Sequence, residues 1–137
     1  MTPEQLLLDE TREWVHRAQE DLRAVDLLNE LPAEALFHCQ QAAEKFMKAY
    51  LTFHQVPFRK THELEEVGTA CANVDPGLGS ALDPSYVLSL YAWKFRYPGA
   101  QYEPHAKDVE LARALAQSVR DEILRRLPSE AATSSPQ

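Results

Sequence analysis

Glycine, cysteine and long apolar runs are scarce in this chain of 137 residues. The four glycines are scattered, so no glycine-rich phosphate loop is recognisable. Charged residues interrupt every apolar run well before the ~18 residues that a membrane span needs. The start "MTPEQLLLDE" lacks the basic residues of a signal peptide. We therefore expect a cytoplasmic protein that is soluble and has no membrane partner.

The two cysteines, Cys39 and Cys71, both occupy apolar positions of helical patterns. This placement predicts reduced thiols in the core, and a disulfide or a catalytic thiol is the less favoured alternative. No spacing of cysteine and histidine resembles a zinc site. The sequence therefore predicts no metal, and nothing in it points to a cofactor.

The formal net charge of −7 argues against sequence-independent binding to nucleic acid. Residues 1–30 hold eight acids and three bases, whereas residues 31–60 hold two acids and four bases. An acidic first helix can pair with a basic second helix inside one bundle or between subunits. A small anionic ligand, or a short local contact with RNA, is compatible with the basic part.

Helical periodicity predicts five helical segments and no strand. In "TPEQ", Thr2 is predicted to cap the first helix, Pro3 to begin it and Gln5 to complete a capping box. The other segments are expected at residues 32–54, at 61–73 with Thr61 as N-cap, from residue 83 to before Pro98, and at 105–127.

Turn-forming residues fill "VDPGLGSALDP", residues 74–84, which is predicted to be a loop. The end of the chain, "PSEAATSSPQ", is predicted to be a disordered tail over residues 128–137. The sequence therefore predicts a single all-α domain over residues 1–127. Its expected architecture is an antiparallel up-and-down bundle of four to five helices.

The second helix, "ALFHCQQAAEKFMKAYL", carries an unusual set of polar residues. At 100° per residue, four of them fall together opposite the apolar face: His38, Gln41, Lys45 and Lys48. Gln40 projects inside the apolar arc, where an unpartnered amide would cost roughly 1–3 kcal/mol. Spacing alone favours a structural interpretation, in which Gln40 bonds a neighbouring helix and Glu44 pairs with Lys48 on the surface. The alternative is a polar functional site.

The stretch "KFRYPGAQYEPH" gathers basic and aromatic residues between the fourth and fifth helices. Arg96 can clamp a phosphate with two donors, and the tyrosines offer stacking faces. With His105, Arg96 could cleave RNA: the imidazole moves the proton of the 2′-hydroxyl or of the leaving oxygen, while the guanidinium holds the scissile phosphate. The residues alone favour a structural alternative, in which Arg96 pairs with an acid of the first helix.

The stretch "FRKTHEL" places Arg59 and Lys60 before Thr61 and His62 at a predicted helix start. The unpaired N–H groups of a helix N-terminus attract anions. A capped helix with solvated bases is nevertheless the favoured interpretation from these residues alone.

Taken in order, these stretches resemble the HEPN domain family (higher eukaryotes and prokaryotes nucleotide-binding domain). The resemblance runs from "WVHRAQEDLRAVDLL" through "FHCQQAAEKFMKAYL" and "KTHEL" to "YAWKFRYP". It implies a bundle of four or five helices that is commonly dimeric and often encoded beside a minimal nucleotidyltransferase. Members are regarded as nucleotide binders or as RNA-cleaving toxins.

The resemblance also suggests which residues form a site. The second-helix pattern, the "TH" element and the "RYP" element together imply a nucleotide- or phosphate-binding set: Gln41, Lys45, Lys48, His62, Arg96 and Tyr97. In the RNase branch an arginine and a histidine lie closer together than Arg96 and His105, which are separated here by eight residues, two of them prolines.

Two functions follow from the resemblance. The first is a nucleotide-binding or interaction subunit, the partner of a minimal nucleotidyltransferase in a toxin–antitoxin-type two-component system. The alternative is a metal-independent endoribonuclease toxin with Arg96 and His105 as catalytic residues. The net charge and the longer spacing favour the first. A homodimer or dimer of dimers is expected, because the apolar and aromatic positions of "YVLSLYAWKF" span more than one helix face.

Overall fold

The computed structural model describes residues 1–95, 98–99 and 103–132, and this part of the chain contains helices but no strands. Three long helices form its body: α1 (Pro3–Leu27), α2 (Pro32–Phe53) and α6 (Ala106–Arg125). Four shorter helices follow α2 along the chain: α3 (Leu64–Val74), α4 (Gly77–Leu82), the 3-10 helix η1 (Asp83–Tyr86) and α5 (Val87–Lys94). The predicted all-α bundle is confirmed.

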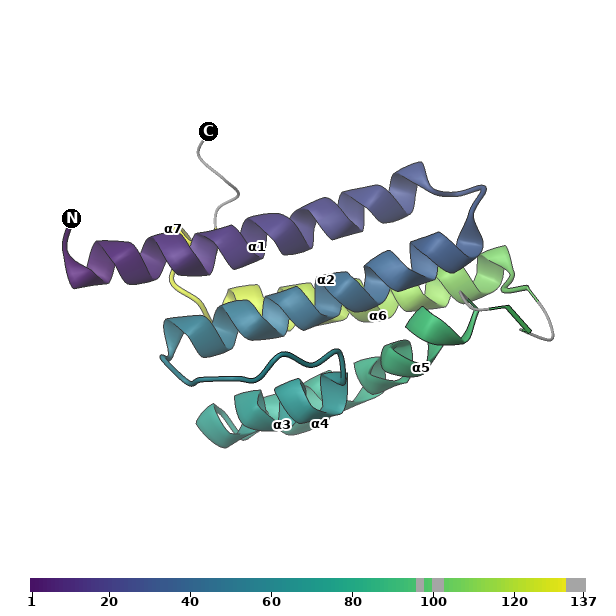
Figure 1. Ribbon diagram of the computed structural model, residues 1–137. Helices are drawn as coiled ribbons and strands as arrows, with labels where there is room; N and C mark the ends of the chain where they lie inside the picture. The colour runs from purple at the N-terminus through teal and green to yellow at the C-terminus, as the bar shows by residue number, and fades with distance from the viewer. Residues whose placement is uncertain (96–97, 100–102, 133–137) are drawn as a thin grey trace.

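Helix α2 is the centre of the bundle. It contacts α1, α3, α5 and α6. In Figure 1, α1 runs antiparallel to α2 on one side, α6 lies behind α2, and α3 to α5 lie on the opposite side from α1. Because neighbours surround α2, it buries residues on most of its circumference, including Leu36, Phe46 and Met47. This central position decides the environment of its polar residues.

Both cysteines are free and buried in the core, as predicted. Burial raises the pKa of the Cys39 thiol, and also that of Cys71, to about 12. Both thiols are therefore protonated at neutral pH, which makes them poor nucleophiles.

Helix α1 begins as its sequence predicts. The Thr2 hydroxyl accepts a hydrogen bond from the Gln5 N–H at 3.1 Å, and the Gln5 side-chain oxygen accepts one from the Thr2 N–H at 2.8 Å. Pro3 occupies the first turn, where its missing N–H has no cost. None of the described helices has the length and apolar content that crossing a membrane would require.

Two predicted boundaries are wrong. The supposed loop over residues 74–84 contains α4 and part of η1, because Leu78 and Leu82 are fully buried and their packing outweighs the unfavourable local residues. Helix α3 begins at Leu64 and is not capped by Thr61. The Thr61 hydroxyl instead accepts a hydrogen bond from the Glu63 N–H, at 3.1 Å, just before the helix.

The prediction of a disordered tail from residue 128 onward is wrong for its first part. A short helix, α7 (Ser129–Ala132), packs against α1. Ala131 is fully buried, and the Glu130 carbonyl accepts a hydrogen bond from Arg12 Nε at 2.6 Å. Such a short helix offers no periodic pattern that a sequence reading can detect. Residues 133–137 lie outside the described part of the chain.

Candidate functional site

A line of buried polar residues runs along one side of α2. Gln40, Glu44 and Lys48 follow one another at steps of four, which makes them neighbours on the helix. They are only 1%, 3% and 5% exposed. The expectation that Lys48 lies opposite the core is wrong, because α2 has more than one buried face. Glu44 and Lys48 form a buried ion pair, and not a surface pair, with 2.8 Å between Oε2 and Nζ.

The Glu44 carboxylate has three donors around it. Besides Lys48, the Gln40 amide donates to Oε1 at 3.0 Å, and His62 Nδ1 lies 2.8 Å from the same oxygen. Burial acts to raise the pKa of the carboxyl, but the hydrogen bonds from Lys48, His62 and Gln40 together outweigh it and lower that pKa below its ordinary value. Glu44 is therefore a fixed negative charge inside the fold at neutral pH.

The Lys48 ammonium is held by its surroundings on several sides. It also donates to the Thr61 carbonyl at 3.3 Å. Its Nζ lies 5.8 Å from the ring centroid of Trp14 and 5.4 Å from that of Phe58, which favours a desolvated cation. Lys48 therefore anchors α1 and the segment after α2 to the buried carboxylate.

His62 combines a buried attachment with an exposed ring. Its side chain is 79% exposed, yet Nδ1 meets the buried Glu44 carboxylate. The His62 carbonyl accepts hydrogen bonds from Gln40 at 3.0 Å and from Ser89 of α5 at 3.3 Å, which fixes the backbone. Since a carboxylate can only accept, Nδ1 carries the proton and Nε2 remains for a ligand. Nε2 can take up a proton and then donate to an anion.

A second carboxylate joins α1 to α2 in the same manner. Asp21 of α1 is buried, with Oδ1 2.7 Å from His38 Nδ1 and Oδ2 2.8 Å from Lys45 Nζ. The side chains of His38 and Lys45 are 28% and 24% exposed. Each carboxylate thus holds one imidazole through Nδ1 and one ammonium.

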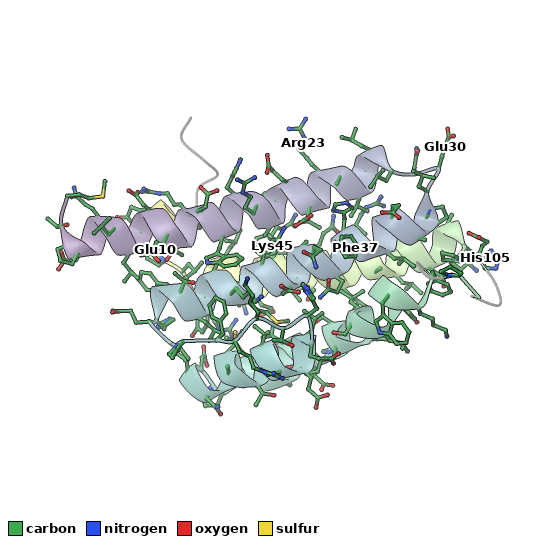
Figure 2. All side chains as sticks on the ribbon, viewed as in Figure 1. Glu10, Arg23, Glu30, Phe37, Lys45 and His105 are labelled. Atoms are coloured by element: carbon green, nitrogen blue, oxygen red, sulfur yellow. The ribbon has the colours of Figure 1, made fainter. Side chains whose placement is uncertain are left out.

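Gln41 lies between the two carboxylate clusters on α2. Its amide donates to the Gln40 side-chain oxygen at 2.8 Å, which links it to the Glu44 cluster. Gln41 is partly exposed, as is Lys45 one turn further along. In Figure 2, Lys45 and Phe37 are labelled on the side of α2 that faces the viewer, with α1 on one side of them and α3 to α5 on the other. Gln41 and Lys45 therefore present polar donors at the surface of α2.

Of the six predicted binding residues, the structure links Gln41, Lys48 and His62 through Gln40 and Glu44. A fourth, Lys45, lies one turn from Gln41 on α2 and is paired with Asp21. Lys48 supports the site from beneath, whereas the other three reach solvent. Arg96 and Tyr97 lie outside the described residues. His105 is the N-cap of α6, and its N–H donates to Asp108 at 2.8 Å. It lies at the end of the bundle, away from Lys45 (Figure 2).

Sequence reasoning missed Asp21, and it grouped His38 with the polar residues of α2 without including it in the predicted binding set. Asp21 sits among the apolar positions Ala18, Leu22 and Val25, so it interrupts the buried face of α1. That is the signal that singled out Gln40 on α2, and it would have indicated a buried carboxylate in need of a cation. Among the described residues, no three histidine, cysteine or carboxylate side chains gather in a way that could hold a metal ion.

Comparison with known proteins identifies the family. The model of the HEPN domain family matches residues 11–127. Comparisons with curated proteins and with solved structures gave no match. The family match spans α1 from Thr11 through α6, and therefore includes both carboxylate clusters. The chain belongs to the HEPN domain family.

Proposed function

We propose that this chain is a binding subunit that takes up a nucleotide or a short RNA segment through its phosphate, on a polar strip formed by the partly exposed Gln41 and Lys45 of α2 and by the exposed His62 ring. Membership of the HEPN family indicates a function connected with nucleotides or RNA in general. The observation that carries the proposal is the His62 ring, which is 79% exposed while its Nδ1 is held by a buried carboxylate. This arrangement adds little packing but aims a polar nitrogen at solvent.

The chemistry of the strip suits a phosphate group. A protonated His62 ring can donate from Nε2, the Gln41 amide offers a further donor, and Lys45 contributes positive charge. Lys45 is already paired with Asp21, and the chain carries a net charge of −7. We therefore expect weak, salt-sensitive binding. Glu44 and Lys48 keep the His62 ring in place and do not themselves meet the ligand.

Replacing His62 with asparagine is expected to weaken phosphate binding at least tenfold. A hydrogen bond to a charged group contributes about 1.5–3 kcal/mol, and roughly 1.4 kcal/mol corresponds to a factor of ten. Calorimetric titration with inorganic phosphate, nucleoside monophosphates and nucleoside triphosphates measures the effect. His54→Asn is the control, because His54 is also exposed but its ring packs against Tyr50, with the ring centroids 4.4 Å apart. Folded wild-type protein that binds nothing in this panel would end the proposal.

We place the protein beside a minimal nucleotidyltransferase, as its partner in a toxin–antitoxin-type system. Support comes from the family alone. Co-expression with a nucleotidyltransferase encoded next to this chain should give one complex in size-exclusion chromatography.

The alternative function, a metal-independent endoribonuclease, is tested by incubating RNA with the purified protein and a chelator. If the wild type cleaves RNA and Arg96→Ala does not, the endoribonuclease would replace the binding function as the proposed activity.

The proposed assembly is a homodimer or a dimer of dimers. Helix α5 supports it with an apolar ridge at steps of three residues: Val87, Leu90 and Trp93 are 38%, 45% and 55% exposed. Trp93→Glu should lower the mass measured by light scattering at micromolar concentration to that of the monomer, because a carboxylate cannot be buried there without a partner. Leu111→Glu on α6, where Leu111 is 62% exposed, is the control and should leave the mass unchanged. A monomeric wild type would contradict the dimer.

A further inference from the structure

The first two turns of α1 lie outside the core. None of residues 3–10 is buried, and the first buried residue of the helix is Thr11. The family match begins at the same residue. In Figure 1, this end of α1 extends beyond the end of α2. The segment, which we call the α1 extension, is about 12 Å long at 1.5 Å per residue.

The α1 extension exposes apolar side chains between its acidic residues. Leu6 is 51% exposed, and Leu7 is only partly buried. A hollow of about 310 Å³ lies between the extension and the end of α2. We call it the α1 notch, and its lining is Pro3, Glu4, Leu6, Leu7, Glu10 and Gln55. This volume is at the lower end of the range found for ligand pockets, about 300–1,000 Å³.

The rim of the α1 notch is negatively charged. Glu4 and Glu10 both line it, and no basic side chain does so in the described part of the chain. Figure 2 shows Glu10 on the side of α1 that faces the end of α2. The nearest arginine along the helix, Arg12, is occupied by Asp9 and by the Glu130 carbonyl. Within the described residues, neither Glu4 nor Glu10 forms an ion pair.

We propose that the α1 notch docks a segment of a partner protein in which an apolar side chain is flanked by lysine or arginine. The apolar side chain would cover Leu6 and Leu7, and the flanking cations would pair with Glu4 and Glu10. The charge disfavours other occupants: nucleic acid and anionic lipid surfaces would be repelled, and a second copy would add its own net charge of −7. This docking does not depend on phosphate binding at α2.

The charge preference of the α1 notch can be tested with two synthetic helical peptides. Both have the same length and the same leucine stripe, but lysines flank the stripe in one peptide and glutamates flank it in the other. In an NMR titration of the full chain, the lysine peptide is expected to shift the amide signals of Leu6, Leu7 and Gln55. The glutamate peptide should leave these signals in place. Any of three results would overturn the proposal. The two peptides could cause equal shifts, neither peptide could cause a shift, or the shifts caused by the lysine peptide could spread over all acidic surfaces of the protein.

Variants locate the contact. Leu6→Ser combined with Glu10→Lys should weaken lysine-peptide binding at least tenfold, and the fold should persist because both residues are exposed. The matched control is Leu111→Ser with Glu110→Lys on α6, an exposed leucine beside an exposed acid, which should bind like wild type. Equal loss in both variants would contradict docking at the notch. Notch signals that change with protein concentration alone would identify a second copy as the occupant and overturn the proposal.

Discussion

Replacing Lys48 with methionine is expected to destabilise the folded protein by about 3–5 kcal/mol, because the Glu44 carboxylate then loses the cation that compensates its burial. For a chain of this size the melting temperature should fall by about 10–20 °C. Methionine keeps the apolar stem against Trp14 and Phe58, so the lost charge dominates over lost packing. Thermal and urea unfolding followed by circular dichroism measure the change.

Two further variants separate burial from charge pairing. Arg17→Met removes one partner of the Glu13–Arg17 pair, which has the same i, i+4 spacing but side chains that are 64% and 60% exposed. It should cost less than about 1 kcal/mol. The double variant Glu44→Gln, Lys48→Met removes both charges and should be more stable than Lys48→Met alone. If Lys48→Met costs no more than Arg17→Met, the pair is not buried in solution.

The contribution of Glu44 to the pH dependence of stability should also change sign. In the wild type the pKa of Glu44 is lowered, so its carboxylate contributes stability above its unfolded pKa, and this contribution is lost as the pH falls through the folded pKa. In Lys48→Met, burial acts against fewer hydrogen bonds and should raise the folded pKa above the unfolded one. Stability is then lost as the pH rises. Relative to the wild type, the melting temperature of the variant should therefore fall as the pH rises above about 4.

The long helices were predictable because their signals are local. Thr2, Pro3 and Gln5 mark the start of α1, and apolar residues at helical steps follow through Val25. The short helix α4 was not predictable in this way. Its sequence, "GLGSAL", has poor helix propensity, and it forms because Leu78 and Leu82 are buried in a helix that contacts α3, η1 and α6. Tertiary packing overrides local preference in such segments.

The candidate site was only partly predictable for a related reason. A helical projection with one apolar face assigned Lys48 to solvent, whereas α2 packs on several sides and encloses it. The projection did place Gln40 inside the apolar arc, and the predicted need for a partner is confirmed by its bonds to Glu44 and His62. The link between His62 and Glu44 joins residues 18 positions apart, so no helical spacing could reveal it.

Gly68 allows α3 to approach η1 closely. It is buried in the middle of α3, where a Cβ atom would clash with the Tyr86 hydroxyl and lie 2.7 and 2.8 Å from its Cε1 and Cζ. Because these ring atoms cannot move independently, the whole Tyr86 side chain would have to shift. Gly68→Ala is therefore expected to destabilise the protein by about 1–2 kcal/mol, since overpacking costs about 1–3 kcal/mol and alanine recovers up to ~1 kcal/mol in helix propensity.

Tyr86 also provides the test of this cause. In a Tyr86→Ala background the clash is absent, and Gly68→Ala should instead stabilise α3 by about 0.5–1 kcal/mol. Gly79→Ala in α4 is the matched control, because a Cβ there would meet only Ala72 at 3.8 Å, an ordinary contact. It should be neutral or stabilising. Destabilisation by Gly68→Ala that persists without the Tyr86 ring would show that the close approach is not its cause.

Gly68→Ala should also change the position of His62 in the candidate site, and the effect should be transmitted through α5. Ser89 of α5 accepts a hydrogen bond from the Leu64 N–H at 2.9 Å, at the start of α3, and donates to the His62 carbonyl at 3.3 Å. A displacement of η1 by an alanine at position 68 would move Ser89, and with it the backbone that aims the His62 ring. We therefore expect the His62 ring signals in NMR spectra to shift in Gly68→Ala and to stay in place in Gly79→Ala. Unchanged ring signals in a destabilised Gly68→Ala protein would mean that Glu44 and Gln40 hold His62 without help from α5.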